Sequence, residues 1–176
     1  GCVAVNEWME SSVAGIYAIG DLVGAPLLAH KASREGIVAV EKMAELDDVT
    51  PVDPRRIPSC TYCHPQVASI GLTEAKAKAE GYTIRVGRFP FSASGMAITL
   101  GETEGMVKVI ADATHGEILG VHIMGTHATE LIAEAGLAIA LEATPEEIAK
   151  SIHAHPTLSE AMGEAALAAL GRAVHV

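Results

Sequence analysis

The order of strand-like and helix-like segments is the feature that most constrains the fold of this chain. Residues 57–124 contain short apolar runs separated by Gly, Pro and other turn residues, which is typical of strands. Residues 126–170 consist mainly of helix-forming residues with an apolar stripe. Strands first and helices after predict an α+β domain, an antiparallel sheet of about five strands with helices on one side.

Individual segments of this domain can be placed from their turn and cap residues. Within residues 57–72 we expect one strand before the bend and a second at 67–70, and further strands are expected at 82–91, 97–100, 105–111 and 117–124. The expected helices are 73–81, 126–142, a short one starting at 144, and 157–170. A bend at His64-Pro65 separates the first two strands, and Thr73 is the expected N-cap of the first helix.

The segment before this domain has a different character. Val13–Asp21 is apolar with almost no alternation, which predicts a buried strand whose end at Gly20-Asp21 could approach a ligand. An amphipathic helix is expected at about 27–46, with Glu35 and Glu41 facing solvent. Because Asp and Pro cluster at 47–54, we expect two parts, residues 1–50 and 51–176.

Charge and cysteine content limit the possible partners and compartments. The formal net charge is −10 without a run of Lys or Arg, which argues against nucleic acid and membrane surfaces as partners. Three cysteines are too few for a disulfide framework, and no apolar run is long enough to span a bilayer. We therefore expect a cytoplasmic location.

His155 and Glu160 are the candidate acid–base residues. Pro156 favours an extended conformation at His155, and Thr157 with Glu160 matches a capping box, so the histidine precedes a helix that has Glu160 in its first turn. Imidazole exchanges protons near neutral pH, and a carboxylate can fix its tautomer. The alternative is that Glu160 only caps the helix beside an ordinary loop histidine, and spacing alone does not decide.

Cys60-Thr61-Tyr62-Cys63-His64 matches the Cys-x-x-Cys-His pattern of haem attachment. A zinc site and a redox dithiol are further alternatives, but a fourth zinc ligand and a following helix are not evident. We favour structural thiols and expect no metal site.

Two motifs resemble a known family. His153-Ala-His155-Pro-Thr-Leu-Ser159-Glu160 resembles the dihydrolipoamide dehydrogenases, which are flavin disulfide oxidoreductases. The shorter His-Pro-Thr-x-x-Glu is shared with glutathione reductases, whereas His153 and Ser159 favour the lipoamide branch. Gly15-Ile-Tyr-Ala-Ile-Gly-Asp21 resembles the second flavin motif of the family.

The resemblance implies roles for specific residues. His155 would accept a proton and Glu160 would be its partner, serving the disulfide and flavin of the other subunit. Asp21 would accept a hydrogen bond from the ribityl chain of FAD. The backbone of the next segment would lie against the flavin, at Leu27, Leu28, Ala29 and His30.

The resemblance also implies an activity and partners. The family oxidises dihydrolipoamide through FAD with NAD as acceptor, as a homodimer that meets the lipoyl domain and the peripheral subunit-binding domain of a dihydrolipoyl acyltransferase. Its two glycine-rich turns and its Cys-x-x-x-x-Cys pair do not occur here, so we expect a C-terminal portion that dimerises without flavin or turnover. The alternatives are a non-catalytic interaction module and a glutathione reductase-like relative.

Phe91-Ser-Ala-Ser94 departs from the family's Phe-x-Ala-Asn, so contacts of that Asn are not carried over.

Overall fold

The computed structural model describes residues 1–175 and divides into two compact units, Gly1–Pro54 and Arg55–Val176.

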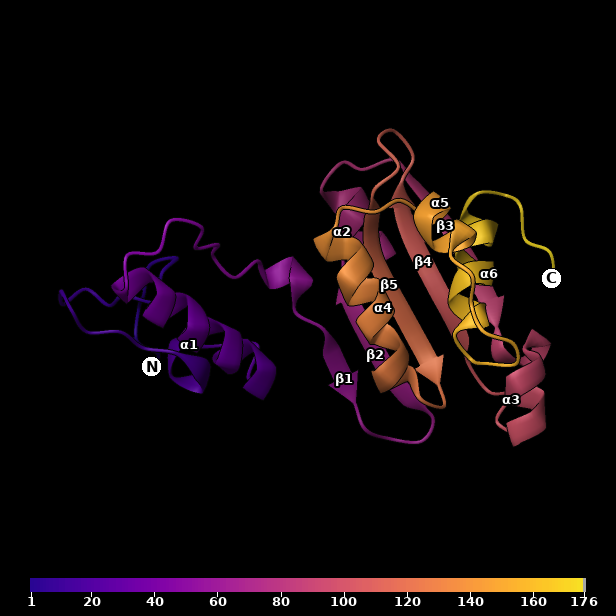
Figure 1. Ribbon diagram of the computed structural model, residues 1–176, viewed down its shortest axis with the longest axis horizontal. Coiled ribbons are helices and arrows are strands. Elements are labelled where there is room, and N and C mark those ends of the chain that lie inside the picture. Colours follow the sequence, from indigo (N-terminus) through magenta and orange to yellow (C-terminus); the bar gives the residue numbers. More distant parts are fainter. Residues whose placement is uncertain (176) are drawn as a thin grey trace. The chain divides into compact units, whose positions relative to one another are not determined.

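The second unit is built on one antiparallel sheet (Figure 1). Its strands are β1 Ser59–Thr61, β2 Gln66–Gly71, β3 Ile84–Pro90, β4 Met106–Asp112 and β5 Ile118–Gly125. The spatial order is β1-β2-β5-β4-β3, and every neighbouring pair is antiparallel. The predicted α+β class with a five-stranded sheet is confirmed.

Three helices cover one face of this sheet (Figure 1). Helix α4 (Ala128–Ala140) packs on β2 and β5, α6 (Glu160–Ala169) packs on β3 and β4, and α5 (Pro145–Lys150) packs on α6. The core between these layers is apolar and buried, and it includes Val107, Val109, Val121, Ile123, Ile132, Ala135, Met162 and Ala165. Burial of this apolar area is the main stabilising contribution to the unit.

Helix α6 lies close to the sheet at β3, where small residues meet at the contact. A Cβ atom on Gly87 of β3 would lie 1.9 Å from the carbonyl oxygen of Ala165 and 2.3 Å from the nitrogen of Ala169. No side chain fits at position 87 without displacing the helix.

A further short helix, α2 (Glu74–Ala79), packs against the opposite face of the sheet. Its Ala77 packs with Ile110, which points away from the face of Val109 because side chains alternate along a strand. Helix α2 therefore shields the side chain of Ile110 from solvent on this face. Thr73 caps α2 as predicted, since its hydroxyl accepts the N–H of Lys76 at 3.2 Å.

The predicted strand at 97–100 is wrong, because Gly95–Leu100 forms helix α3. The Ser94 hydroxyl accepts the N–H of Ala97 at 3.4 Å, and Gly101 ends the helix in the left-handed conformation with φ of 73°. A four-residue segment with three apolar side chains fits a strand or a helix equally well, and the two caps decide in favour of the helix.

The first unit consists of a long loop and α1 (Ala29–Met43). The predicted buried strand at 13–20 is not formed within the described residues of this unit, where the loop makes two isolated bridges, Val5–Ser11 and Glu10–Tyr17. Val13 and Ile16 are more than half exposed. An extended segment becomes a strand only beside a second strand, and none lies next to it here.

Across residues 1–175, no helix combines the length and the apolar character that crossing a bilayer requires.

Candidate active site

The loop between α5 and α6 carries the predicted acid–base pair. Nδ1 of His155 lies 2.8 Å from Oε1 of Glu160, and Oε2 of the same carboxylate accepts the N–H of Thr157 at 2.9 Å. The hydroxyl of Thr157 donates to the carbonyl of Ala154 at 2.6 Å instead of capping α6. One oxygen of the Glu160 carboxylate therefore accepts a backbone N–H at the start of the helix, and the other contacts the imidazole of His155.

The imidazole of this pair is open to solvent. The side chain of His155 is 77% exposed, whereas that of Glu160 is 34% exposed. A carboxylate that accepts Nδ1–H leaves Nε2 of the neutral ring as an acceptor. The arrangement can take a proton from a ligand that approaches Nε2.

The charge of Glu160 suits this role. Burial raises the pKa of its carboxyl, but hydrogen bonds from Thr157 and His155 outweigh burial and hold the pKa below its ordinary value of 4.5. Glu160 is therefore ionised at neutral pH and can stabilise an imidazolium at His155.

A second histidine–carboxylate pair lies in the same loop. Nε2 of His153 is 2.8 Å from Oε1 of Glu134 on α4, and the His153 side chain is 13% exposed. A Cβ on Gly163 of α6 would come within 3.1 Å of Nδ1 of His153. The loop is thus attached to α4 as well as to α6. Sequence reasoning missed Glu134, because a partner 19 residues away on another element leaves no local pattern.

A pocket of about 280 Å³ adjoins both pairs. His153, His155 and Glu160 line it together with Glu164 and His175. Glu164 is buried, pairs with Nδ1 of His175 at 2.8 Å and accepts the N–H groups of Val174 and His175. Burial raises the pKa of Glu164, but these hydrogen bonds outweigh it and lower the pKa below its ordinary value. The residues near the C-terminus therefore form part of the pocket wall.

The predicted cofactor residues of the first unit lie on adjacent segments. Asp21 lies in the 3-10 turn η1 (Gly20–Val23) with its side chain exposed, and Leu27, Ala29 and His30 are exposed at the start of α1. Leu28 is the N-cap residue of α1. The residues fit a polar cofactor chain, because an exposed carboxylate can accept hydroxyl donors and a helix N-terminus presents N–H groups.

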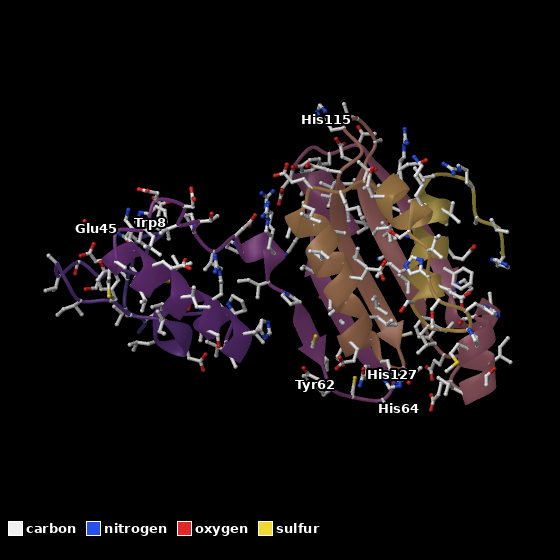
Figure 2. The ribbon with its side chains drawn as sticks, viewed as in Figure 1. Trp8, Glu45, Tyr62, His64, His115 and His127 are labelled. Carbon is white, nitrogen blue, oxygen red and sulfur yellow. The ribbon has the colours of Figure 1, made fainter. Side chains whose placement is uncertain are left out.

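The Cys-x-x-Cys-His motif lies at the β1–β2 hairpin. Cys60 lies partly buried on β1, where burial and the charge of Glu130 raise the pKa of its thiol and favour the unreactive protonated form. Cys63 donates to the carbonyl of Pro65 at 3.1 Å. Tyr62 and His64 lie at the end of the β1–β2 hairpin (Figure 2), and Nε2 of His64 is 3.5 Å from a carboxylate oxygen of Glu102. Within residues 1–175, no three His, Cys, Asp or Glu side chains are arranged to hold a metal ion.

The fold and this loop define a class of domain. The family model described as pyridine nucleotide-disulphide oxidoreductase, dimerisation domain, matches residues 57–166, and the chain therefore belongs to this family. The match covers the sheet, all helices of the second unit except the end of α6, and the pairs His155–Glu160 and His153–Glu134.

Particular relatives are dihydrolipoyl dehydrogenases. The chain is 57% identical to that of Rhizobium etli over 99% of its own length and 36% of the relative, and 53% identical to that of Bacillus subtilis over 99% and 37%. The chain thus spans little more than a third of the length of these relatives.

Solved structures give the same fold. LpdA from Mycobacterium tuberculosis superposes with a TM-score of 0.89 at 25% identity, covering 94% of this chain and 36% of that one. The flavoprotein disulfide reductase RclA from Escherichia coli superposes with a TM-score of 0.81 at 21% identity over 94% of this chain and 38% of that one, a likeness of fold alone.

Proposed function

We propose that this chain supplies the acid–base pair and the dimer surface of a flavin disulfide oxidoreductase that oxidises dihydrolipoamide to lipoamide with NAD as acceptor. The observation that carries the proposal is the 2.8 Å contact of His155 with Glu160 on a ring that is 77% exposed. The similarity to dihydrolipoyl dehydrogenases supports the choice of substrate.

The proposed chemistry is a proton transfer at Nε2 of His155. This atom takes the proton of a dihydrolipoamide thiol, and the resulting thiolate, a far better nucleophile than the thiol, attacks a disulfide on the partner subunit. Glu160 keeps Nδ1 protonated and stabilises the positive ring. FAD, when bound, would carry the electrons from the dithiol to NAD.

The first unit is proposed to be the end of an FAD-binding domain, residues 1–50, followed by the interface domain, 51–176. The division of the structure after Pro54 and the family match from residue 57 support this assignment. We infer that Asp21 and the segment Leu27–His30 contact the cofactor. Several apolar side chains of the first unit are more than half exposed, which supports cover by further protein; they are Val13, Ile16, Leu22, Leu27, Val40 and Leu46.

A second copy of the chain is the proposed cover of the site loop. Ile152, directly before His153, is 100% exposed, and Ile98 of α3 is more than half exposed. Apolar side chains beside a polar pocket are typical of surfaces that become buried on association.

The proposal includes a homodimer, with the lipoyl domain and the peripheral subunit-binding domain of a dihydrolipoyl acyltransferase as further partners, and a cytoplasmic location. The family resemblance supports these partners, and the acidic charge and low cysteine content support the location.

The test uses protein made from the complete reading frame that encodes this chain. We expect flavin absorbance and NAD reduction that depends on dihydrolipoamide. His155→Gln should abolish most of this activity, and His115→Gln, at an exposed turn of the β4–β5 hairpin, is the matched control. Turnover of glutathione in place of lipoamide would favour the glutathione reductase-like alternative. Equal activity of the two variants would contradict the proposed role of His155.

A further inference from the structure

A buried ion pair lies on α1 in the first unit. Nζ of Lys31 is 2.9 Å from Oε1 of Glu35, one helical turn away, and the two side chains are 8% and 4% exposed. The amphipathic pattern predicted Glu35 in solvent, which is wrong. Removing both charges from water is costly unless their remaining hydrogen-bonding positions are filled, so the groups that fill them indicate what the pair does.

Those positions are filled by the backbone of a single turn. Oε2 of Glu35 accepts the N–H of Gly20 at 2.8 Å. Nζ of Lys31 donates to the carbonyl of Gly24 at 3.1 Å and, at a longer 3.4 Å, to the carbonyl of Gly20. The pair therefore holds the residues on both sides of Asp21.

Without the hydrogen bonds with Lys31 and Glu35, the Gly20–Gly24 turn could adopt several backbone conformations. Gly20 and Gly24 both have positive φ, at 73° and 106°, and glycine adopts many other conformations at little cost. Gly20 also lies against α1, since a Cβ there would be 3.3 Å from Cβ of Ala32. Between the two glycines, Asp21 exposes its carboxylate. Fixing the two glycines fixes where this carboxylate points.

We propose that Lys31 and Glu35 are positioning residues that fix the Gly20–Gly24 turn so that the Asp21 carboxylate meets the hydroxyl groups of the FAD ribityl chain. The inference rests on the proposed function, which assigns a flavin to this unit. It adds a role for two buried residues that do not touch the cofactor. A purely structural pair would stabilise α1 without any dependence on Asp21.

The test is a double-mutant cycle in the protein from the complete reading frame, read out as the dissociation constant of FAD from reconstitution of the apoprotein. Glu35→Leu removes the acceptor of the Gly20 N–H and should weaken FAD binding about tenfold or more. Glu35→Gln keeps an acceptor oxygen and should have a smaller effect. Arg34→Gln, an exposed neighbour on α1, should leave the constant unchanged.

The decisive readout is the effect of Glu35→Leu in an Asp21→Ala background. If the pair acts through Asp21, the second change adds little once the carboxylate is gone, because the effects of coupled residues are not additive. If Glu35→Leu does not fold, Lys31→Met with Glu35→Gln serves instead, since it loses the Gly24 contact without leaving a buried unpaired charge.

Each outcome decides between defined alternatives. Additive losses of FAD affinity, or unchanged affinity in the charge-removing variants, would overturn this inference and leave the proposed function standing. A wild-type protein that binds no FAD would overturn the proposed function and this inference together.

Discussion

The His155–Glu160 pair and the Lys31–Glu35 pair are alike in chemistry and opposite in burial. Each has a carboxylate in the first two turns of a helix, 2.8 or 2.9 Å from a nitrogen. The side chain of His155 is 77% exposed, whereas that of Lys31 is 8% exposed. An exposed ring can exchange a proton with a ligand, while an enclosed ammonium can only hold its neighbours. The exposure of the nitrogen-bearing side chain, and not the presence of a carboxylate partner, distinguishes the candidate catalytic pair from the structural pair.

The largest expected effect is on turnover at the exposed pair. His155→Gln should lower dihydrolipoamide oxidation by about 10²- to 10⁴-fold, because the thiol proton loses its acceptor. Stability should change by no more than about 0.5 kcal/mol, since the ring is at the surface. Steady-state kinetics and urea unfolding of the same sample measure both quantities. A large loss of stability in His155→Gln would show that the exposed pair is structural, as the buried Lys31–Glu35 pair is.

At the buried pair, Lys31–Glu35, we expect a large loss of stability. Glu35→Ala should destabilise the first unit by about 3–5 kcal/mol, because the charge of Lys31 is left buried without its partner. The chain has one tryptophan, Trp8, whose ring lies 4.7 Å from Nζ of Lys42 on α1, so its fluorescence reports unfolding of this unit. Arg34→Ala on the exposed side of the helix is the control. Equal unfolding midpoints for both variants would refute a structural role for the pair.

An intermediate effect is expected at the half-buried pair of the second unit. Glu134→Ala removes the partner of His153 and should cost about 1–3 kcal/mol, since an imidazole that is 13% exposed loses a hydrogen bond. Circular dichroism during urea unfolding measures the loss. Glu130→Ala, at an exposed position of the same helix, should cost less than about 0.5 kcal/mol. If the two variants unfold alike, the loop does not depend on its attachment to α4.

The smallest expected effect is the pH dependence contributed by Glu160. Because folding lowers the pKa of this carboxyl below 4.5, its stabilising contribution is complete above that pH and is lost as the pH falls through the lower folded value. The stability difference between wild type and Glu160→Gln should therefore shrink below about pH 4.5, with a total change under about 1 kcal/mol for so accessible a pair. Urea midpoints at pH 7, 5, 4 and 3 provide the measurement. A difference that grows as the pH falls would contradict the lowered pKa.

Features set by neighbouring residues could be predicted from the sequence. Thr73 as a cap, the bend at His64-Pro65 and the contact of His155 with Glu160 all depend on residues within five positions. The α+β class followed from the order of segments. Such local signals suffice when the physical cause is itself local.

Features that depend on distant segments could not be predicted. The partner of His153 is on another helix, and Glu35 matched a solvent-facing position because its acceptor role depends on a turn 15 residues earlier. Residues 13–20 looked like a buried strand, yet a strand requires a neighbour to pair with. Residues 97–100 were too short a segment to distinguish a strand from a helix, and the helix is fixed by its caps at Ser94 and Gly101.

The missing side chain at Gly87 has a consequence for which mutations the protein can tolerate. Even the methyl group of alanine would overlap the backbone of α6, so the helix would have to move outward as a body. Glu160 and Gly163 move with that helix, whereas Glu134 stays on another one. Gly87→Ala on β3 would therefore first displace His153 and His155 from their positions, although residue 87 contacts neither histidine.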